Sequence, residues 1–111
     1  RGHPMGISFN SSFDDLARFV NDCANTACKL GVLAMPGKFE EVDDAFIKYA
    51  INLVVDGRDP QEVRSVLDTK TAEMVRAYEH KLKMFCEATC SIQKGEQVSK
   101  IVEACEKWRV D

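Results

Sequence analysis

The sequence predicts an all-α fold, a small antiparallel bundle of about four helices in which the third helix is long. Three observations indicate this class. Apolar residues recur at steps of three and four along most of the chain. Residue types that cap helices precede these stretches, and Gly or Pro falls between them. The sequence contains no sustained two-residue alternation of the kind that marks a strand.

The first helix is predicted to begin at Ser11–Ser12, because a serine hydroxyl can cap free backbone N–H groups. Asp14 and Asp15 follow, where acidic side chains suit the positive end of a helix. Gly31 and Pro36–Gly37 are expected to end this helix. Its expected apolar face consists of Phe13, Leu16, Ala17, Val20, Ala24, Ala27 and Leu30.

The second helix is predicted from about Glu40 to Val55, where Asp56–Gly57 ends it with a left-handed glycine cap. An acidic run precedes it, which we interpret as a favourable interaction with the helix dipole rather than a catalytic carboxylate pair. The acidic run is Glu40, Glu41, Asp43 and Asp44. The expected apolar face is Val42, Ala45, Phe46, Tyr49, Ala50, Leu53 and Val54.

The third helix has the strongest start signal in the chain. Asp59 is expected to be its N-cap, with Pro60 in the first turn and Glu62 three residues after the cap. Neither Gly nor Pro interrupts it before Lys94–Gly95, so it is predicted to be long. Its apolar residues are Val63, Val66, Leu67, Met74, Val75, Tyr78, Leu82, Phe85 and Ile92, and we interpret them as core.

A fourth helix is predicted from Glu96 to Trp108, with Val98, Ile101, Val102, Cys105 and Trp108 on one face. The breaks at 31–39, 56–59 and 94–96 are short. Short connections favour antiparallel neighbours, as in a small bundle.

Length and composition fit a single helical domain, which we expect over residues 8–111. Hydrophobic residues make up 45% of the chain, and its net charge is −3, which argues against nucleic acid as the partner. The longest apolar runs fall far short of the ~20 residues that cross a bilayer, so we expect a soluble chain. Residues 1–7 lack the apolar core of a signal peptide and match nothing around them, so we interpret them as a vector-derived remnant.

Catalytic chemistry is not apparent in the sequence. It lacks a phosphate-binding glycine loop and an HExxH zinc motif. Of its two histidines, His80 is the only candidate general base, and its charged neighbours favour an exposed surface position. We therefore expect no catalytic residues, and an enzyme is the least favoured class.

The five cysteines leave two readings. Cys86 and Cys90 share one helix face, and Cys105 on the returning helix could approach them to form a metal or redox site. Cys23 and Cys28 are spaced more widely than usual zinc ligands. The favoured reading is that these are small, reduced core residues, so neither a metal nor a cofactor is expected.

Three segments resemble the flagellar motor stator protein MotA, of the MotA/TolQ/ExbB proton channel family. Residues 46–64 are similar to its cytoplasmic loop, and Val54–Val55–Asp56–Gly57–x–Asp59–Pro60 is the most diagnostic piece. Residues 31–35 resemble the family's Gly-Leu-Leu-Ala-Leu segment. Residues 86–96 are similar to its C-terminal tail, where a helix ends in Ser-Ile-Gln-x-Gly-Glu. The resemblance covers about residues 13–109.

In that family two transmembrane helices separate the loop from the tail, and this sequence lacks them. The resemblance therefore implies a fusion of loop (about 11–80) to tail (about 81–109), joined between about Glu79 and Lys83. A natural soluble relative is the alternative. The parent protein would lie at the cytoplasmic face of the bacterial inner membrane. A fusion of two helical extensions accounts for one long third helix.

The resemblance implies that the parent conducts ions together with MotB and other MotA copies, and that its loop contacts the rotor protein FliG through complementary charges. The family's basic and acidic contact positions correspond here to Cys28 and Pro36. We therefore expect nearby charges to make the contact. The candidate rotor-binding residues are Lys29, Lys38, Glu40, Glu41, Arg58 and Arg64. A helical adaptor that binds a partner helix in an apolar groove is a further alternative.

Overall fold

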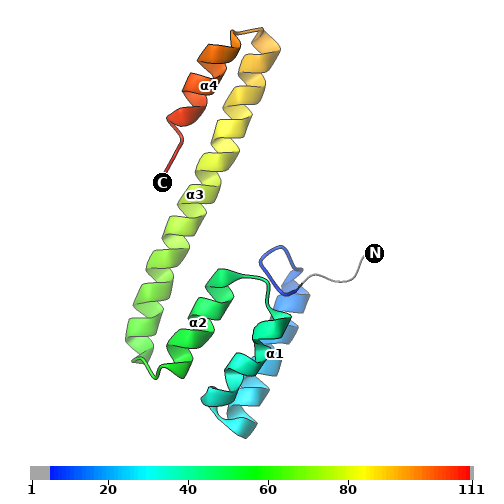
Figure 1. Ribbon diagram of the computed structural model, residues 1–111, viewed down its shortest axis with the longest axis vertical. Helices are drawn as coiled ribbons and strands as arrows, with labels where there is room; N and C mark the ends of the chain where they lie inside the picture. Colours follow the sequence, from blue (N-terminus) through cyan, green and yellow to red (C-terminus); the bar gives the residue numbers. More distant parts are fainter. Residues whose placement is uncertain (1–5, 111) are drawn as a thin grey trace. The chain divides into compact units, whose positions relative to one another are not determined.

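The computed structural model describes residues 6–110. Over this range the chain is all-α, with five helices and no strand beyond one isolated bridge. In chain order the helices are α1 (Phe13–Leu30), η1 (Val32–Glu41), α2 (Ala45–Val55), α3 (Pro60–Lys94) and α4 (Val98–Glu106) (Figure 1). The predicted fold class and the long third helix are therefore confirmed.

The chain divides into two compact units, residues 1–65 and 66–111. The first unit contains α1, η1 and α2 together with the first residues of α3. The second unit contains the rest of α3 and α4. Each unit is described separately below.

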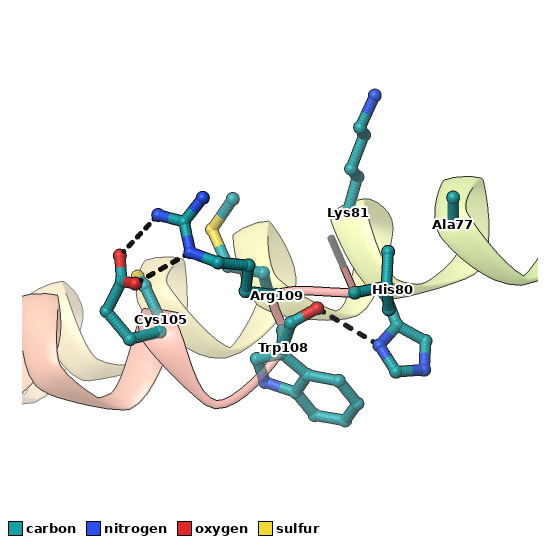
Figure 2. Close-up of a pocket in the computed structure, with 9 residues that line it drawn as sticks. Ala77, His80, Lys81, Cys105, Trp108 and Arg109 are labelled. Atoms are coloured by element: carbon teal, nitrogen blue, oxygen red, sulfur yellow. Dashed lines mark hydrogen bonds and ion pairs between the residues drawn. The ribbon is translucent and has the colours of Figure 1, made fainter.

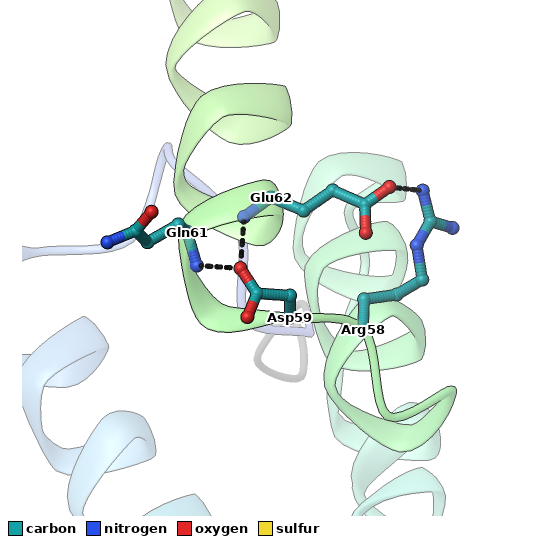
Figure 3. A network of polar contacts seen from close by, with 4 residues as sticks. All are labelled: Arg58, Asp59, Gln61 and Glu62. Carbon is teal, nitrogen blue, oxygen red and sulfur yellow. Dashed lines mark hydrogen bonds and ion pairs between the residues drawn. The ribbon is translucent and has the colours of Figure 1, made fainter.

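The predicted helix starts are visible in the capping hydrogen bonds. At the start of α1, the Ser12 hydroxyl accepts a hydrogen bond from the backbone N–H of Asp15 across 3.1 Å. At the start of α3, Asp59 Oδ2 accepts from the N–H groups of Gln61 and Glu62 at 3.0 and 3.3 Å (Figure 3). These side chains satisfy N–H groups that have no partner within the helix.

The second helix starts later than predicted, and a short additional helix precedes it. A break was expected at 31–39 and a helix from about Glu40. Residues 32–41 instead form the 3₁₀ helix η1, and α2 begins only at Ala45. Asp44 is its N-cap, since its Oδ1 accepts from the N–H of Ile47 at 2.9 Å. The predicted end is confirmed, because Gly57 has φ +73°.

The reason for the late start of α2 is a backbone pairing that involves Ile7. Ile7 N donates to Glu41 O and Asp43 N donates to Ile7 O, each across 2.7 Å. Val42, between these two partners, is therefore extended and buried rather than helical. Ile7 falls within the segment that we excluded as vector-derived, yet it packs against the core. Residues 1–5 of that segment lie outside the described residues.

The core of the first unit is formed by a different face of α1 than predicted. Phe13, Val20 and Leu30 are exposed, whereas Phe19 and Cys23 are buried. The buried pair is also spaced at i and i+4, so helical periodicity alone does not distinguish it from the predicted face. The buried core cluster consists of Phe19, Cys23, Met35, Val42 and Ile51.

In the second unit, α4 folds back antiparallel along α3 (Figure 1). The residues of α3 that line the hollows beside α4 include Ala77, His80, Met84, Ala88 and Ser91. Neither α3 nor α4 contains a buried residue. The interpretation of the large apolar residues of α3 as core is therefore wrong. The side of α3 that meets α4 is made mostly of small and polar residues, so the large apolar side chains point elsewhere.

Candidate functional site

A hollow of about 330 Å³ lies between the end of α1 and η1. Lys29, in the last turn of α1, and Lys38, in η1, both line it. The turn at Gly31, with φ +89°, lets the chain reverse between these two helices. The fold thus brings together two candidate lysines that are nine residues apart in sequence. The lining consists of Asp22, Asn25, Thr26, Lys29, Leu30 and Lys38.

An acidic side chain extends this charged surface. Lys38 Nζ lies 3.4 Å from Glu41 Oε2, and the Lys38 side chain is only 22% exposed. Because Lys38 is held by its surroundings, its ammonium has a more defined position than a freely moving surface lysine. Glu40, next to Glu41 at the end of η1, is exposed. The end of the first unit that carries η1 therefore presents both signs of charge close together.

The two candidate arginines lie at a different place in the first unit. Arg58 Nη2 forms an ion pair with Glu62 Oε2 across 2.8 Å at the start of α3 (Figure 3). The hydrogen bond between them raises the pKa of Arg58 and lowers the pKa of Glu62. Arg64 follows one turn along α3. Neither arginine lines the hollow that contains Lys29 and Lys38.

The structure also shows where Cys28 and Pro36 lie, the two positions at which this sequence departs from the MotA pattern. Cys28 is exposed in the last turn of α1, directly before Lys29. Pro36 lies inside η1, and it carries no charge that could replace the family's acid. Any charged contact in this region therefore depends on the neighbouring lysines and glutamates.

His80 is half-buried, which corrects the prediction of an exposed surface histidine. It lines a hollow of about 370 Å³ between α3 and the end of the chain (Figure 2). Its Nδ1 lies 3.0 Å from the carbonyl oxygen of Trp108, and the two rings meet edge to face with centroids 5.3 Å apart. Because a carbonyl oxygen only accepts, His80 Nδ1 carries the proton and donates it. This histidine fastens the chain end to α3.

The cysteines of the second unit do not meet. Cys105 is half-buried and lines the hollow beside α3, whereas Cys86 and Cys90 are exposed. Each of these two is two residues from Ala88, which faces α4, so each lies about 160° around the helix from it. Among residues 6–110, no group of three possible ligands is placed to hold a metal ion. The structure therefore does not bring Cys86 and Cys90 to the side of α3 on which Cys105 lies.

A second surface feature of the first unit is an apolar groove of about 370 Å³. Residues of α1, η1 and α2 form it, and Phe9 and Phe46 meet there edge to face with centroids 5.8 Å apart. All eleven lining side chains are apolar. This is the kind of surface that the adaptor reading predicts, whereas the charged hollow is the kind that the stator reading predicts.

Fold and surface together define a class of protein, a small helical chain with a mixed-charge surface at one end of its first unit. Comparison with known proteins adds a family relationship. The chain is 26% identical over 77 residues to motility protein A of Bacillus subtilis, which covers 69% of this chain and 28% of that protein. It is 28% identical over 72 residues to motility protein A of Helicobacter pylori, covering 65% and 26%. It is 30% identical over 59 residues to motility protein A of Borreliella burgdorferi, covering 53% and 23%.

These similarities support a relationship to the motility protein A family. The chain spans about a quarter of the length of the curated relatives that it matches. No protein-family model and no solved structure matches the chain. Within residues 6–110, no helix combines the length and the apolar character that crossing a membrane requires.

Proposed function

We propose that this chain is the cytoplasmic part of a flagellar stator subunit, loop joined to tail, and that its first unit contacts the rotor protein FliG to transmit torque. The single observation that carries the contact is the pairing of Lys29 and Lys38 in one hollow, with Glu41 bound to Lys38. The similarity to motility protein A over more than half of the chain supports the wider assignment.

In this proposal the function is not enzymatic. Ion flow through the membrane part of the parent, assembled with MotB and other stator copies at the inner membrane, supplies the work. The charged surface then acts by complementarity with the rotor. Such contacts speed association and fix orientation, and salt weakens them.

The hollow is favoured over the arginines as the centre of the contact. The Arg58 guanidinium already pairs with Glu62, and any rotor carboxylate must compete with that partner. Lys29, by contrast, lines an open hollow, so an incoming carboxylate can approach its ammonium there. Lys38 lies beside it and is paired with Glu41, but across 3.4 Å, which is longer than the 2.8 Å between Arg58 and Glu62. Arg58 and Arg64 would then contribute at the edge of the surface, where single charges carry little energy.

The test is a titration of the whole chain with the C-terminal domain of the rotor protein from the same organism, followed by NMR at low and high salt. We expect salt-sensitive shift changes around Lys29, Lys38 and Glu41. Lys29→Glu and Lys38→Glu should remove most of them. Lys100→Glu, an equal charge change on exposed α4, is the matched control and should leave them intact. Absence of shifts at low salt with the chain folded, or equal loss in all three variants, contradicts the proposal.

A further inference from the structure

Two cysteines of α3 lie one helical turn apart on the same face of the helix. Cys86 and Cys90 are both exposed, free thiols. Four residues of α-helix turn the chain through about 400°, so their Cβ atoms point to the same side, roughly 5–6 Å apart. The other cysteines form no such pair, since Cys23 is buried, Cys28 is five positions from it, and Cys105 lines the hollow on the other side of α3.

Two lysines lie in line with this pair of thiols. Lys83 precedes Cys86 by three positions and Lys94 follows Cys90 by four, so each lysine is a one-turn neighbour of one cysteine. Lys83 Nζ lies 3.2 Å from Glu79 Oε2, but both side chains are more than half exposed, and an ion pair in water is weak. A positive charge therefore stands at each end of the dithiol.

On its other side the pair borders a stripe of exposed apolar side chains on α3. Leu82 of this stripe is one turn before Cys86. Apolar neighbours exclude water from one side of the thiols, which suits a soft ion bound by sulfur better than a hard cation that takes oxygen ligands. The stripe consists of Val75, Tyr78, Leu82, Phe85 and Ile92, each between 51% and 69% exposed.

Two thiolates on one helical turn are a ligand set for Cu(I). Thiolate sulfur is the kind of ligand that selects this soft ion. A structural zinc site needs four ligands, and within residues 6–110 no cluster of even three possible ligands occurs. Cu(I) is complete with two sulfurs on opposite sides of it. A metal–thiolate bond is about 2.3 Å long, as for zinc, so the two sulfurs would lie about 4.6 Å apart.

We propose that Cys86 and Cys90 bind one Cu(I) ion between their sulfurs and so hold one turn of α3 in its helical form. Each sulfur is one bond beyond its Cβ atom, so staggered χ1 angles can set this separation with the helix backbone unchanged. Each thiol releases its proton to solvent on binding. One Cu(I) with two thiolates carries a net negative charge, which the ammonium groups of Lys83 and Lys94 compensate. This inference does not rest on contact with the rotor protein.

Competition for the ion tests the site, with the reduced whole chain titrated in the absence of oxygen against a coloured Cu(I) chelator. We expect one ion per chain. Cys86→Ser and Cys90→Ser should each lower the affinity by about 100-fold or more, because mutation of an outer-shell partner alone typically costs about 10–100-fold and these are direct ligands.

Cys28→Ser is the matched control, because it removes an exposed thiol that lies outside the pair. All three substitutions are at exposed positions, so each variant should fold as the original chain does. Absence of binding, equal affinity in all three variants, or one ion shared between two chains overturns the proposal.

Removal of each lysine charge tests the compensation. Lys83→Gln and Lys94→Gln should each weaken Cu(I) binding by about threefold at low salt and by less at high salt, since single exposed charges contribute little. Lys100→Gln, an equal change on exposed α4, is the control and should leave the affinity unchanged. The same affinity in all three variants would overturn the part assigned to the two charges.

Amide hydrogen exchange tests whether the ion holds the turn in its helical form. Because the ion binds two side chains that only the helix brings together, it should stabilise the last third of α3 against local opening. We expect exchange to slow over residues 87–94 on addition of Cu(I) and to stay unchanged in α1. Faster or unchanged exchange over residues 87–94 with the ion bound would show that the sulfurs meet only when the helix unwinds, which contradicts the proposed geometry.

Discussion

The indole N–H of Trp108 donates a hydrogen bond to Glu87 Oε1 across 2.7 Å, and this contact joins the segment after α4 to the last third of α3. The other oxygen of the same carboxylate lies 3.2 Å from Lys107 Nζ. With the bond from His80 to the Trp108 carbonyl, three contacts hold the segment after α4 in place. The hydrogen bond between Glu87 and Trp108 is therefore the central polar contact that holds the segment after α4 against α3.

We expect Trp108→Phe to raise the pKa of Glu87 toward its ordinary value of 4.5. The hydrogen bond from Trp108 is the largest cause of the lowered pKa, and the bond from Lys107 is the next, so part of the lowering should persist. NMR titration of the glutamate carboxyl carbons measures this shift. Glu106, whose pKa is held low by Arg109, is the internal control. An unchanged Glu87 titration would show that the indole bond is not formed.

Acidification should loosen the same contact. A carboxyl group whose pKa is lowered on folding stabilises the structure above its unfolded pKa of about 4.5, and this contribution is lost as pH falls through the lower folded value. Trp108 is the only tryptophan, so its fluorescence reports on the contact directly. We expect the emission to change below pH 4.5 and to stay constant between pH 6 and 8, with Glu87→Gln abolishing the acid transition.

Phe19→Ala is expected to destabilise the first unit strongly, and Phe13→Ala is expected to have little effect. Both side chains lie on α1, but Phe19 is 6% exposed and Phe13 is 84% exposed. Replacing a buried phenylalanine with alanine typically lowers the free energy of unfolding by about 3–5 kcal/mol. A substitution at an exposed position typically changes it by less than about 0.5 kcal/mol. Urea denaturation followed by circular dichroism compares the two. Similar midpoints for both variants would contradict the assigned core face.

Asp59→Ala should destabilise the start of α3 by about 1 kcal/mol, because two backbone N–H groups lose their shared acceptor. Amide hydrogen exchange should rise at Gln61 and Glu62 and remain slow further along the helix. Asp59→Asn, which retains a capping oxygen, should restore most of the protection. Equal exchange in the alanine and asparagine variants would argue against the cap.

Thiol reactivity should separate the three exposed cysteines from the buried Cys23. Cys28, Cys86 and Cys90 are exposed and should react quickly with an aromatic disulfide reagent at pH 8. Cys23 should react slowly, because burial raises its pKa and blocks access. Mass spectrometry of partially labelled protein identifies each site. Protection of Cys86 and Cys90 by added zinc would instead support the metal reading.

Much of the local structure follows from interactions between residues a few positions apart, and these can be predicted from the sequence. Ser12 and Asp59 are caps because a hydroxyl or carboxylate placed before a helix can reach its free N–H groups without help from distant residues. Gly57 and Gly95 end helices because a positive φ costs glycine little. These features depend on neighbours a few residues away, and they were predictable.

The predicted buried face of α1 was wrong because two sets of residues fit the same helical periodicity. Phe13–Val20 and Phe19–Cys23 are both acceptable helical stripes, and only packing against η1 and α2 selects the second. The start of α2 was misplaced because the pairing of Ile7 with Val42 joins residues that no local signal connects. The candidate site was partly predictable, since Lys29 and Lys38 were identified by charge, but their meeting in one hollow depends on the turn between α1 and η1.

The sequence by itself determined the helical class, the caps and the uninterrupted length of α3, because each depends on interactions within about one helical turn. Only the tertiary structure decided which faces are buried and which remain exposed. Burial depends on what lies opposite a helix, and a periodic pattern does not contain that information. The stripe from Val75 to Ile92, interpreted as core from its spacing, is exposed for that reason, since the residues of α4 meet another side of the helix.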